Sequence, residues 1–486
     1  MDIRVKFMGG AGTVTGSRFL LEIDRFRLLI DCGLFQGLKE LRLRNWETFP
    51  TDPAKIDAIV LTHAHIDHSG YLPKLIKEGF SGPIYLTEAS LELVKILLLD
   101  AGKLQEEEAK FAAQKGYSKH QKPLPLFTQE DAEKVFPLLK PISFEEEVVI
   151  HDRVLLTAYN AGHILGAAIL KLKIQGENQE KKLVFSGDLG RYRDPILNPP
   201  ADIPFADVLF LESTYGDRVN ESSDIDKRLG KVIRETYQRG GVSLIPSFAV
   251  GRTQMILFYL HRLQEKGLIP NIPIYVDSPM AINVTELYKK FVHYHHLGPS
   301  LEERGANPFL HPNLHYYRDQ EASMSLNHIR GDAIIISASG MATGGRILHH
   351  LYHRLPNEND SVLFVGYQPE GTRGRKILDG EETCRIYGID VPVKASIHFI
   401  DGLSAHADQT ELVSWCENFI SKPKFTFLVH GEKEASEKLA GILKETYGWH
   451  TICPQYMESF EIVHRHMKSN FRGYIRWNQG NLKKHP

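Results

Sequence analysis

The amino-terminal part of the chain alternates apolar and polar positions in short runs that predict β-strands. Ile3, Val5 and Phe7 alternate with polar residues, and the runs RFLLEI and FRLLIDCG follow a glycine-rich turn. Because successive side chains of a strand point to opposite faces, this pattern predicts the antiparallel start of a sheet layer. The turn, GGAGTVTGS, lacks the spacing of a phosphate-binding loop, so we interpret it as a plain glycine turn.

Strands and helices then alternate in an order typical of an α/β fold. A short buried strand in DAIVL is followed by a histidine cluster and by a helical stretch over 71–78. The segment 84–147 reads as the strand PIYLT and charged helical stretches, with Thr128 and Asp131 spaced as in a capping box. Strands return at VLLTAYNAGH, AILKLKI, KLVFSGD and DVLFLEST, and each of them ends in a polar cluster.

The pattern changes after residue 217, where helix and strand signals alternate regularly through GVSLIPS, IPIYVDS, AIIISASG and SVLFVGY. This alternation predicts a parallel sheet with helices between its strands. The later run KFTFLVHGE matches the first part of the chain again. We therefore predict one domain, made of residues 1–216 and 401–486, into which a second α/β domain, 217–400, is inserted.

The composition excludes some classes of protein but does not identify the chemistry of this one. The 486 residues include 42% hydrophobic and 24% charged residues, as in ordinary globular proteins, and the net charge of -2 gives no bulk attraction to nucleic acid. No run approaches the ~18 apolar residues of a membrane span, and the first residues do not resemble a signal peptide. We expect a soluble, cytoplasmic protein without a membrane partner.

The cysteines form no metal-binding or redox pair. The four of them are widely spaced along the chain: Cys32, Cys384, Cys416 and Cys453. This spacing argues against a disulfide framework and fits a reducing compartment. Any metal must therefore be bound by carboxylates and by some of the 23 histidines.

The strongest chemical signal is the run HAHIDH, residues 63–68. His63 and His65 alternate at the end of a strand, so their side chains point the same way and can share one metal ion. Asp67 and His68 come where the strand gives way to a turn and helix, so they can face a second ion. A chance surface cluster does not explain three histidines and an aspartate directly after a buried strand.

Further candidate ligands stand at the ends of later strands. His163 lies in NAGHILG, Asp188 in FSGDLG and His430 in LVHGE, and glycine flanks each of them. Taken singly, each is more often a cap or a core residue than a ligand, but together with HAHIDH they form a set. Nitrogen and oxygen ligands of this kind suit zinc, with manganese as the alternative metal.

These residues carry a resemblance to the metallo-β-lactamase superfamily. Asp31, HAHIDH, His163 and Asp188 resemble its four successive motifs in their order, and the region past 217 resembles the β-CASP insertion of the nucleic-acid-processing branch. Glu212 in FLEST, His406 in GLSAHAD and His430 in LVHGE resemble the β-CASP motifs A, B and C. The segments PSFAVGRTQ, SASGMATGGR and GYQPEGTRGR are also similar to recurrent segments of the family. The resemblance implies an αββα sandwich with an inserted α/β β-CASP domain.

The resemblance also implies the roles of the site residues. It places one zinc on His63, His65 and His163, a second on Asp67, His68 and His430, and Asp188 between the two. Asp31 would order the histidine loop from behind.

The implied activity is zinc-dependent hydrolysis of RNA phosphodiester bonds, by internal cleavage or from the 5′ end. A hydroxide bridging the two metals would be the nucleophile, and His406 the general acid. Glu212 would orient His406, and Asp67 completes the predicted catalytic set. Histidine at position 430 favours RNA, because DNA-acting members of the family usually carry an aliphatic residue there. Within the family the chain is similar to compact bacterial relatives of ribonuclease J and of the pre-mRNA 3′-end cleavage endonuclease. We expect neither an RNA-binding domain before the first strand nor an extra domain after the last.

Candidate contacts to single-stranded RNA lie in loops and in the tail. The polar residues predicted to touch phosphate are Ser404, Arg252, Arg346, Arg373 and Arg375. The tail from Arg465 to Lys484 interleaves basic and aromatic residues, which suits stacking on RNA bases but equally a packed strand with a basic end. Alternative interpretations are a hydrolase of a small ester or thioester and a non-catalytic RNA-binding scaffold. The oligomeric state is open, with a homodimer among the alternatives.

Overall fold

The computed structural model describes residues 2–115, 124–177, 179–220, 224–302, 306–366, 368, 370–465 and 472–478. They form two compact units. Unit 1 consists of Met1–Tyr192, Pro199–Val219 and His406–Pro486, and unit 2 of Arg193–Asn198 and Asn220–Ala405.

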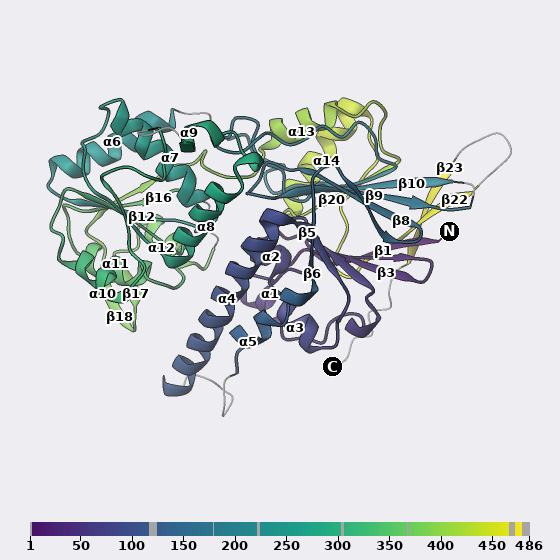
Figure 1. The fold of residues 1–486 in the computed structure, drawn as a ribbon, viewed down its shortest axis with the longest axis horizontal. Coiled ribbons are helices and arrows are strands. Elements are labelled where there is room, and N and C mark those ends of the chain that lie inside the picture. The colour runs from purple at the N-terminus through teal and green to yellow at the C-terminus, as the bar shows by residue number, and fades with distance from the viewer. Residues whose placement is uncertain are drawn as a thin grey trace. The chain divides into compact units, whose positions relative to one another are not determined.

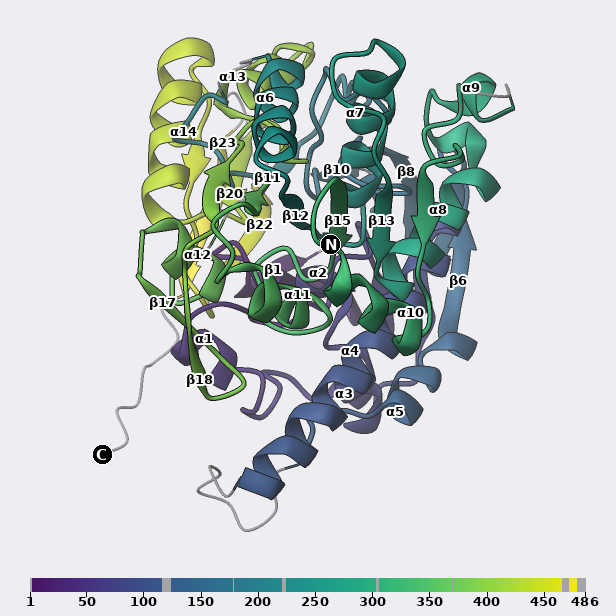
Figure 2. The same cartoon turned by 90° about the vertical axis from the view of Figure 1, so that its left-hand side faces the viewer.

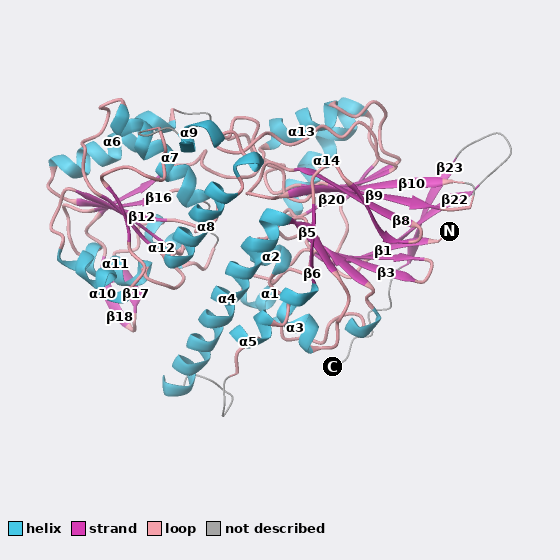
Figure 3. Cartoon of the chain, viewed as in Figure 1, coloured by secondary structure: helices cyan, strands magenta, loops and turns pink. Residues whose placement is uncertain are grey.

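Unit 1 is built on two facing sheets (Figures 1 and 3). Within the described residues, one sheet has the strand order β23 (Arg472–Asn478), β22 (Ser459–Arg465), β1 (Ile3–Gly9), β2 (Arg18–Ile23), β3 (Phe26–Ile30), β4 (Ala58–Val60), β5 (Ile84–Thr87) and β6 (Leu139–Ile142). The other sheet has the order β21 (Thr451–Ile452), β20 (Phe425–Val429), β11 (Val208–Glu212), β10 (Glu180–Phe185), β9 (Ala168–Gln175), β8 (Val154–Asn160) and β7 (Glu147–His151). The predicted antiparallel start is confirmed, because β1, β2 and β3 pair antiparallel.

Helices cover the outer faces of both sheets. Helix α4 (Glu88–Lys115) packs against β5 and β6, and α14 (Lys433–Tyr447) packs against β20 and β21. The other helical segments of unit 1 are α1 (Lys39–Leu43), η1 (Pro53–Lys55), α2 (Ile66–Ser69), α3 (Leu72–Lys77), α5 (Gln129–Glu133), η2 (Phe136–Leu138) and α13 (Gln409–Glu417). This order of layers is the predicted αββα sandwich, and the predicted capping box of Thr128 opens α5.

An aromatic stack fills the space between the two sheets. Phe185 and Phe210 lie parallel with ring centroids 4.0 Å apart, and Phe427 and Phe19 continue the stack on either side. Each ring is almost completely buried, and burying one such side chain contributes roughly 1.5–3 kcal/mol. Because Phe185, Phe210 and Phe427 lie close to the carboxyl ends of β10, β11 and β20, the stack holds those strand ends in place.

Unit 2 is a parallel sheet with helices on both faces, as the alternation of signals predicted. Its order is β14 (Leu314–Tyr316), β13 (Ile274–Asp277), β15 (Ala333–Ser337), β12 (Val242–Pro246), β16 (Ser361–Phe364) and β19 (Ser396–Phe399), and its neighbouring strands pair parallel. Helices α6 (Ile225–Gln238) and α7 (Arg252–Glu265) lie on one face, and α11 (Ile347–Arg354) and α12 (Arg373–Leu378) on the other (Figures 1 and 2). The remaining elements are α8 (Pro279–Lys290), η3 (Val292–Tyr294), α9 (Gly298–Glu302), α10 (Gln320–Ser325), η4 (Leu326–His328) and the hairpin β17 (Thr383–Ile386) with β18 (Ile389–Pro392).

Two compositional expectations can be compared with the structure. The four cysteines are all free, as their spacing indicated. Among the described residues no helix is both long and apolar enough to span a membrane.

Strands β22 and β23 include part of the basic aromatic tail, while Lys468, Phe471, Lys483 and Lys484 lie outside the described residues.

Candidate metal centre

The HAHIDH run begins in the turn that follows β4 and continues into the four-residue helix α2. Strand β4 ends at Val60, so His63 and His65 stand in the turn rather than on the strand where the sequence pattern placed them. Their imidazoles nevertheless converge, with Nε2 of His63 3.1 Å from Nδ1 of His65. Asp67 and His68 lie on α2, as predicted, and therefore face a different point.

The second sheet contributes the other candidate ligands from loops that follow its strands. His163 follows β8, Asp188 follows β10 and His430 follows β20. The loops of His163 and Asp188 approach closely, because a Cβ on Gly190 would lie 1.8 Å from the carbonyl oxygen of Gly162. Glycine at position 190 is therefore what allows these two loops to meet.

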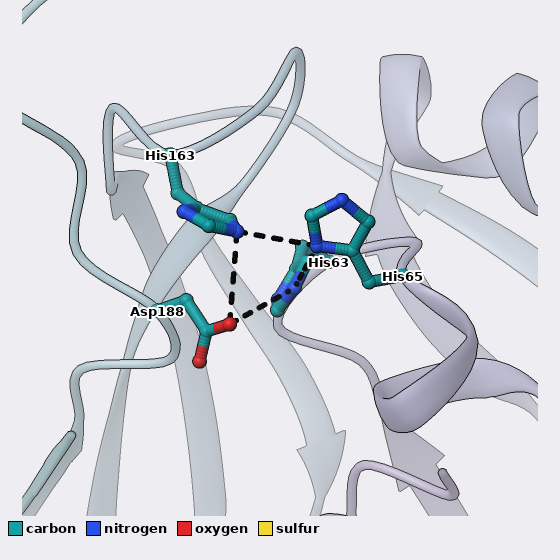
Figure 4. A group of neighbouring side chains, drawn as sticks. All are labelled: His63, His65, His163 and Asp188. Carbon is teal, nitrogen blue, oxygen red and sulfur yellow. Dashed lines mark hydrogen bonds and ion pairs between the residues drawn. The ribbon is translucent and has the colours of Figure 1, made fainter. Parts of the chain in front are cut away.

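One group of ligand atoms comes from His63, His65, His163 and Asp188 (Figure 4). Nε2 of His163 lies 3.2 Å from Nδ1 of His65 and 3.6 Å from Oδ2 of Asp188. Nε2 of His63 lies 3.5 Å from the same carboxylate oxygen. Four atoms held by a tetrahedral zinc at roughly 2.0–2.1 Å are separated by about 3.3 Å, so these spacings fit one metal ion.

A second group lies on the other side of Asp188. Nε2 of His68 is 3.1 Å from Nε2 of His430 and 3.8 Å from Oδ2 of Asp67, and Asp67 is 3.3 Å from His430. Oδ2 of Asp188 is 3.4 Å from Nε2 of His68. One carboxylate oxygen is thus nearly equidistant from both groups, which is the position that a bridging ligand requires.

The side-chain partners of His63 and His68 determine which ring nitrogen faces the cluster. Nδ1 of His68 donates to Oδ2 of Asp31 at 2.8 Å, and Nδ1 of His63 donates to Oγ1 of Thr62 at 3.0 Å. The Thr62 hydroxyl in turn donates to Oδ2 of Asp31 at 2.8 Å. In its neutral form each histidine therefore keeps a lone pair on Nε2, toward the cluster, and Asp31 accepts hydrogen bonds from both His68 and Thr62.

His430 is oriented in the same way by the other sheet. Its Nδ1 lies 3.1 Å from Oγ1 of Thr214, whose hydroxyl donates to the carbonyl oxygen of His430 at 3.0 Å. Nδ1 must then be the donor, so Nε2 presents its lone pair to His68 and Asp67. Sequence reasoning assigned no role to Thr62 or Thr214, although they adjoin HAHIDH and Glu212 respectively.

The pKa values of the cluster residues are strongly shifted by burial and by their charged neighbours. Burial lowers the pKa of His63 well below its usual range and that of His65 to about 4, so both rings are neutral. Burial also opposes the charge of His68, but nearby carboxylates, chiefly that of Asp188, hold its pKa well above the usual range. Burial alone would raise the pKa of Asp67, yet the neighbouring histidines lower it to about 2. His63, His65 and Asp67 are thus in the forms that bind metals, whereas His68 would release a proton when a metal binds.

His406 and Glu212 lie beside the cluster, within unit 1. Nδ1 of His406 is 3.2 Å from Oε2 of Glu212, and Nε2 is 4.0 Å from Oδ2 of Asp188. Glu212 is fully buried and also accepts a hydrogen bond from the backbone N–H of Leu189, next to Asp188. Burial disfavours the charged form of His406, but Glu212 outweighs it and raises the pKa of His406 to about 9.

The residues predicted to contact RNA lie in unit 2, where the arginines are engaged with the chain itself. Arg346 donates to Asp277 at 2.6 Å and to backbone carbonyls, and Arg252 donates to the carbonyl of Val365. Arg373 donates to the carbonyl oxygen of Ala342, and Arg375 to the carboxylate of Asp379. Ser404 is half-buried in the loop between β19 and α13. Their contacts with RNA stay a prediction.

Comparison with known proteins identifies the family. Three family models match: the metallo-beta-lactamase superfamily domain over residues 20–204, the Beta-Casp domain over 253–377, and the Zn-dependent metallo-hydrolase RNA specificity domain over 390–454. Ribonuclease TTHA0252 of Thermus thermophilus is 39% identical over 91% of this chain and 96% of its own length. The chain belongs to the β-CASP branch of the metallo-β-lactamase superfamily. It is therefore a member of a family of metal-dependent hydrolases.

Two further relatives carry the name transcription termination factor FttA. Transcription termination factor FttA of Methanosarcina mazei is 32% identical over 90% of this chain and 68% of its own length. FttA of Thermococcus kodakarensis is 31% identical over 95% of this chain and 71% of its own length. Among solved structures, a protein of unknown function from Enterococcus faecalis has a TM-score of 0.53 at 15% identity, covering 94% of this chain and 99% of its own. That likeness supports the fold alone.

Proposed function

We propose that this protein is a two-zinc ribonuclease that hydrolyses phosphodiester bonds of single-stranded RNA. The observation that carries the proposal is the position of Asp188, whose Oδ2 lies 3.4–3.6 Å from histidine nitrogens of both ligand groups. One group is His63, His65 and His163, and the other is Asp67, His68 and His430. Manganese is the alternative occupant, because it accepts the same nitrogen and oxygen donors.

When bound, two zinc ions would polarise a phosphate oxygen and lower the pKa of water toward neutrality. The chain's own residues then position the reacting groups. Asp188 and Asp67 would supply the negative charge that compensates the bound cations. Leu189, through its backbone bond to Glu212, fixes the loop that carries Asp188.

His406 is the proposed general acid. Glu212 occupies its Nδ1, so Nε2 points toward Asp188 and carries the proton that a departing ribose oxygen needs. Glu212 acts as a positioning residue, because it is completely buried and bonds both His406 and Leu189. A simple ester hydrolase does not require such a separately oriented acid, which favours the phosphodiester substrate.

The choice of RNA is supported by the relatives. A ribonuclease is 39% identical over nearly the whole chain, and the carboxyl-terminal part matches a model named for RNA specificity. The free cysteines fit a reducing compartment such as the cytoplasm. A homodimer is the alternative to a monomer, which sedimentation equilibrium distinguishes.

The test is cleavage of labelled single-stranded RNA by the zinc-loaded protein, with linear 5′-triphosphate, linear 5′-monophosphate and circular substrates. We expect cleavage that a chelator abolishes and that His68→Ala reduces to background. Cutting of the circle identifies an endonuclease, and release of nucleotides from the 5′-monophosphate end alone identifies an exonuclease. Turnover that survives both chelation and His68→Ala would overturn the proposal, as would fewer than one metal ion per chain in protein purified without chelator.

A further inference from the structure

Unit 2 contains a basic pocket whose lining includes none of the candidate metal ligands and none of Arg252, Arg346, Arg373 and Arg375. The pocket has a volume of about 420 Å³ and is lined by Asn327, His328, Arg330, His353, Arg354 and Asn357. This volume is within the range of small-ligand sites and suits a nucleotide. No carboxylate is among the lining residues.

The pocket lies at the amino-terminal edge of the parallel sheet. Arg330 stands just before β15, and Asn357 just before β16. Arg252 and Arg346, by contrast, follow the carboxyl ends of β12 and β15. The pocket therefore opens at the opposite edge of the sheet of unit 2 from those arginines.

Arg354 forms the floor of the pocket and is already bonded to the chain, so it is not a group that would contact a bound molecule directly. It is almost completely buried, its guanidinium donates to the carbonyl oxygens of Leu326 and Ile329, and it lies 3.5 Å from the carboxylate of Asp360. The buried Asp360 also accepts a hydrogen bond from the N–H of Val242. The positive charge of Arg354 is thus compensated from behind.

Arg330 is different, because its charge is not compensated. Within the described part of the chain, the exposed guanidinium of Arg330 makes no hydrogen bond and no ion pair. It lies close enough to Arg354 to repel its charge, and the imidazoles of His328 and His353 stand exposed on the same pocket. The one uncompensated cation that lines the pocket among the described residues is therefore Arg330, and a guanidinium binds phosphate oxygens in bidentate fashion.

We propose that this pocket binds the phosphate group of a nucleotide. Arg330 provides the bidentate contact, His328 and His353 offer further donors and rings on which a base can stack, and Asn327 and Asn357 offer amide groups to a base or ribose. The phosphate can belong to a free nucleotide or to one unit of an RNA chain. If the phosphate belongs to RNA, the inference rests on the proposed ribonuclease function, in which RNA is the substrate.

The test is calorimetric titration of the full-length protein, in chelator so that no cleavage occurs, with AMP, with adenosine and with a 12-nucleotide RNA. We expect AMP to bind and adenosine to bind at least tenfold more weakly. Arg330→Met is expected to weaken binding of AMP, of RNA or of both by about tenfold or more, the loss of one charge-assisted contact. Weakening with AMP alone identifies a free-nucleotide site, and weakening with RNA identifies a contact along the RNA.

Lys231→Met is the matched control, because it removes one exposed positive charge from helix α6 of the same unit. His353→Gln tests the pocket a second time and should weaken the same ligands. Unchanged titrations in both pocket variants, or equal weakening by Lys231→Met, would overturn the proposal. Zinc content and RNA cleavage by the unaltered protein are measured separately, so failure of the ribonuclease proposal remains distinguishable from failure of the pocket.

Discussion

Thr214 and His430 exchange two hydrogen bonds across the ends of strands β11 and β20. The hydroxyl of Thr214 donates to the carbonyl oxygen of His430, and Nδ1 of His430 donates back to the hydroxyl oxygen. Thr214, which follows β11, thus determines which ring nitrogen carries the proton in His430, which follows the neighbouring strand β20. This arrangement leads directly to a test of the metal centre.

Thr214→Val keeps the side-chain volume and removes the hydroxyl, so His430 loses the partner that fixes Nε2 as its free nitrogen. We expect the affinity for one metal ion to fall by about tenfold or more, with the other ion unaffected. Competition with a chromophoric chelator measures both affinities. Thr214→Ser is the control and should bind both ions like the unaltered protein. Equal behaviour of the valine and serine variants would exclude this role of the hydroxyl.

Asp188→Asn should weaken both metal ions together, because one oxygen serves both ligand groups. Asparagine keeps the size of aspartate but lacks its charge, and metals strongly prefer the carboxylate. His68→Ala, which alters one group only, provides the comparison. Metal content after dialysis is the measurement. Retention of two ions by the asparagine variant would show that Asp188 is not the bridging residue.

Glu212→Gln should slow cleavage by about tenfold or more while leaving the metal content unchanged. The glutamine still accepts the hydrogen bond of Leu189 but no longer places a negative charge next to His406. His406→Ala should cost a larger factor, on the order of 10² to 10⁴ in kcat. Because Glu212 is proposed to act through His406, the double variant should be no slower than His406→Ala. Additive losses would assign Glu212 a separate role.

His311 in unit 2 gives a prediction for stability against pH. Burial, with the neighbouring His261, lowers the pKa of His311 to about 4; Glu265 opposes this shift and His315 adds to it. In the unfolded chain the pKa is about 6.5, so the unfolded state binds more protons between pH 6.5 and 4. The stabilising contribution is therefore complete above pH 6.5 and is lost as the pH falls through 4.

His311→Phe removes this dependence. We expect the difference in unfolding free energy between pH 7.5 and pH 4.5 to shrink by about 1–2 kcal/mol, less than the full shift implies because the ring is partly exposed. Urea unfolding followed by circular dichroism at the two pH values measures the difference. An unchanged pH dependence would mean that His311 does not titrate in this way.

The sequence was sufficient for the strands that precede the candidate ligands and for the grouping of HAHIDH with His163, Asp188 and His430, because buried strands that end in histidine or aspartate produce a regular pattern. It missed other strands, among them β6, β14 and β19. It misplaced His63 and His65 on a strand, since the pattern of alternation cannot show that β4 already ends at Val60.

Other features depend on contacts that a local pattern does not contain. Thr214 meets His430 from 216 positions away, through a backbone turn in which His430 has a φ of 49°. The guanidinium of Arg346 is likewise held by Asp277, 69 positions earlier. Threonine and arginine are common residues, so nothing in the sequence distinguishes these two from many others.

The order of the site residues along the chain has a consequence for synthesis. Glu212 and the earlier candidate ligands leave the ribosome before the main segment of unit 2, Asn220–Ala405, whereas His406 and His430 follow it. Until synthesis has passed residue 430, a nascent protein contains one complete candidate ligand group but lacks the proposed acid, His406, and the candidate ligand His430. The inserted unit thus delays the moment at which a nuclease can form beside the messenger RNA that encodes it.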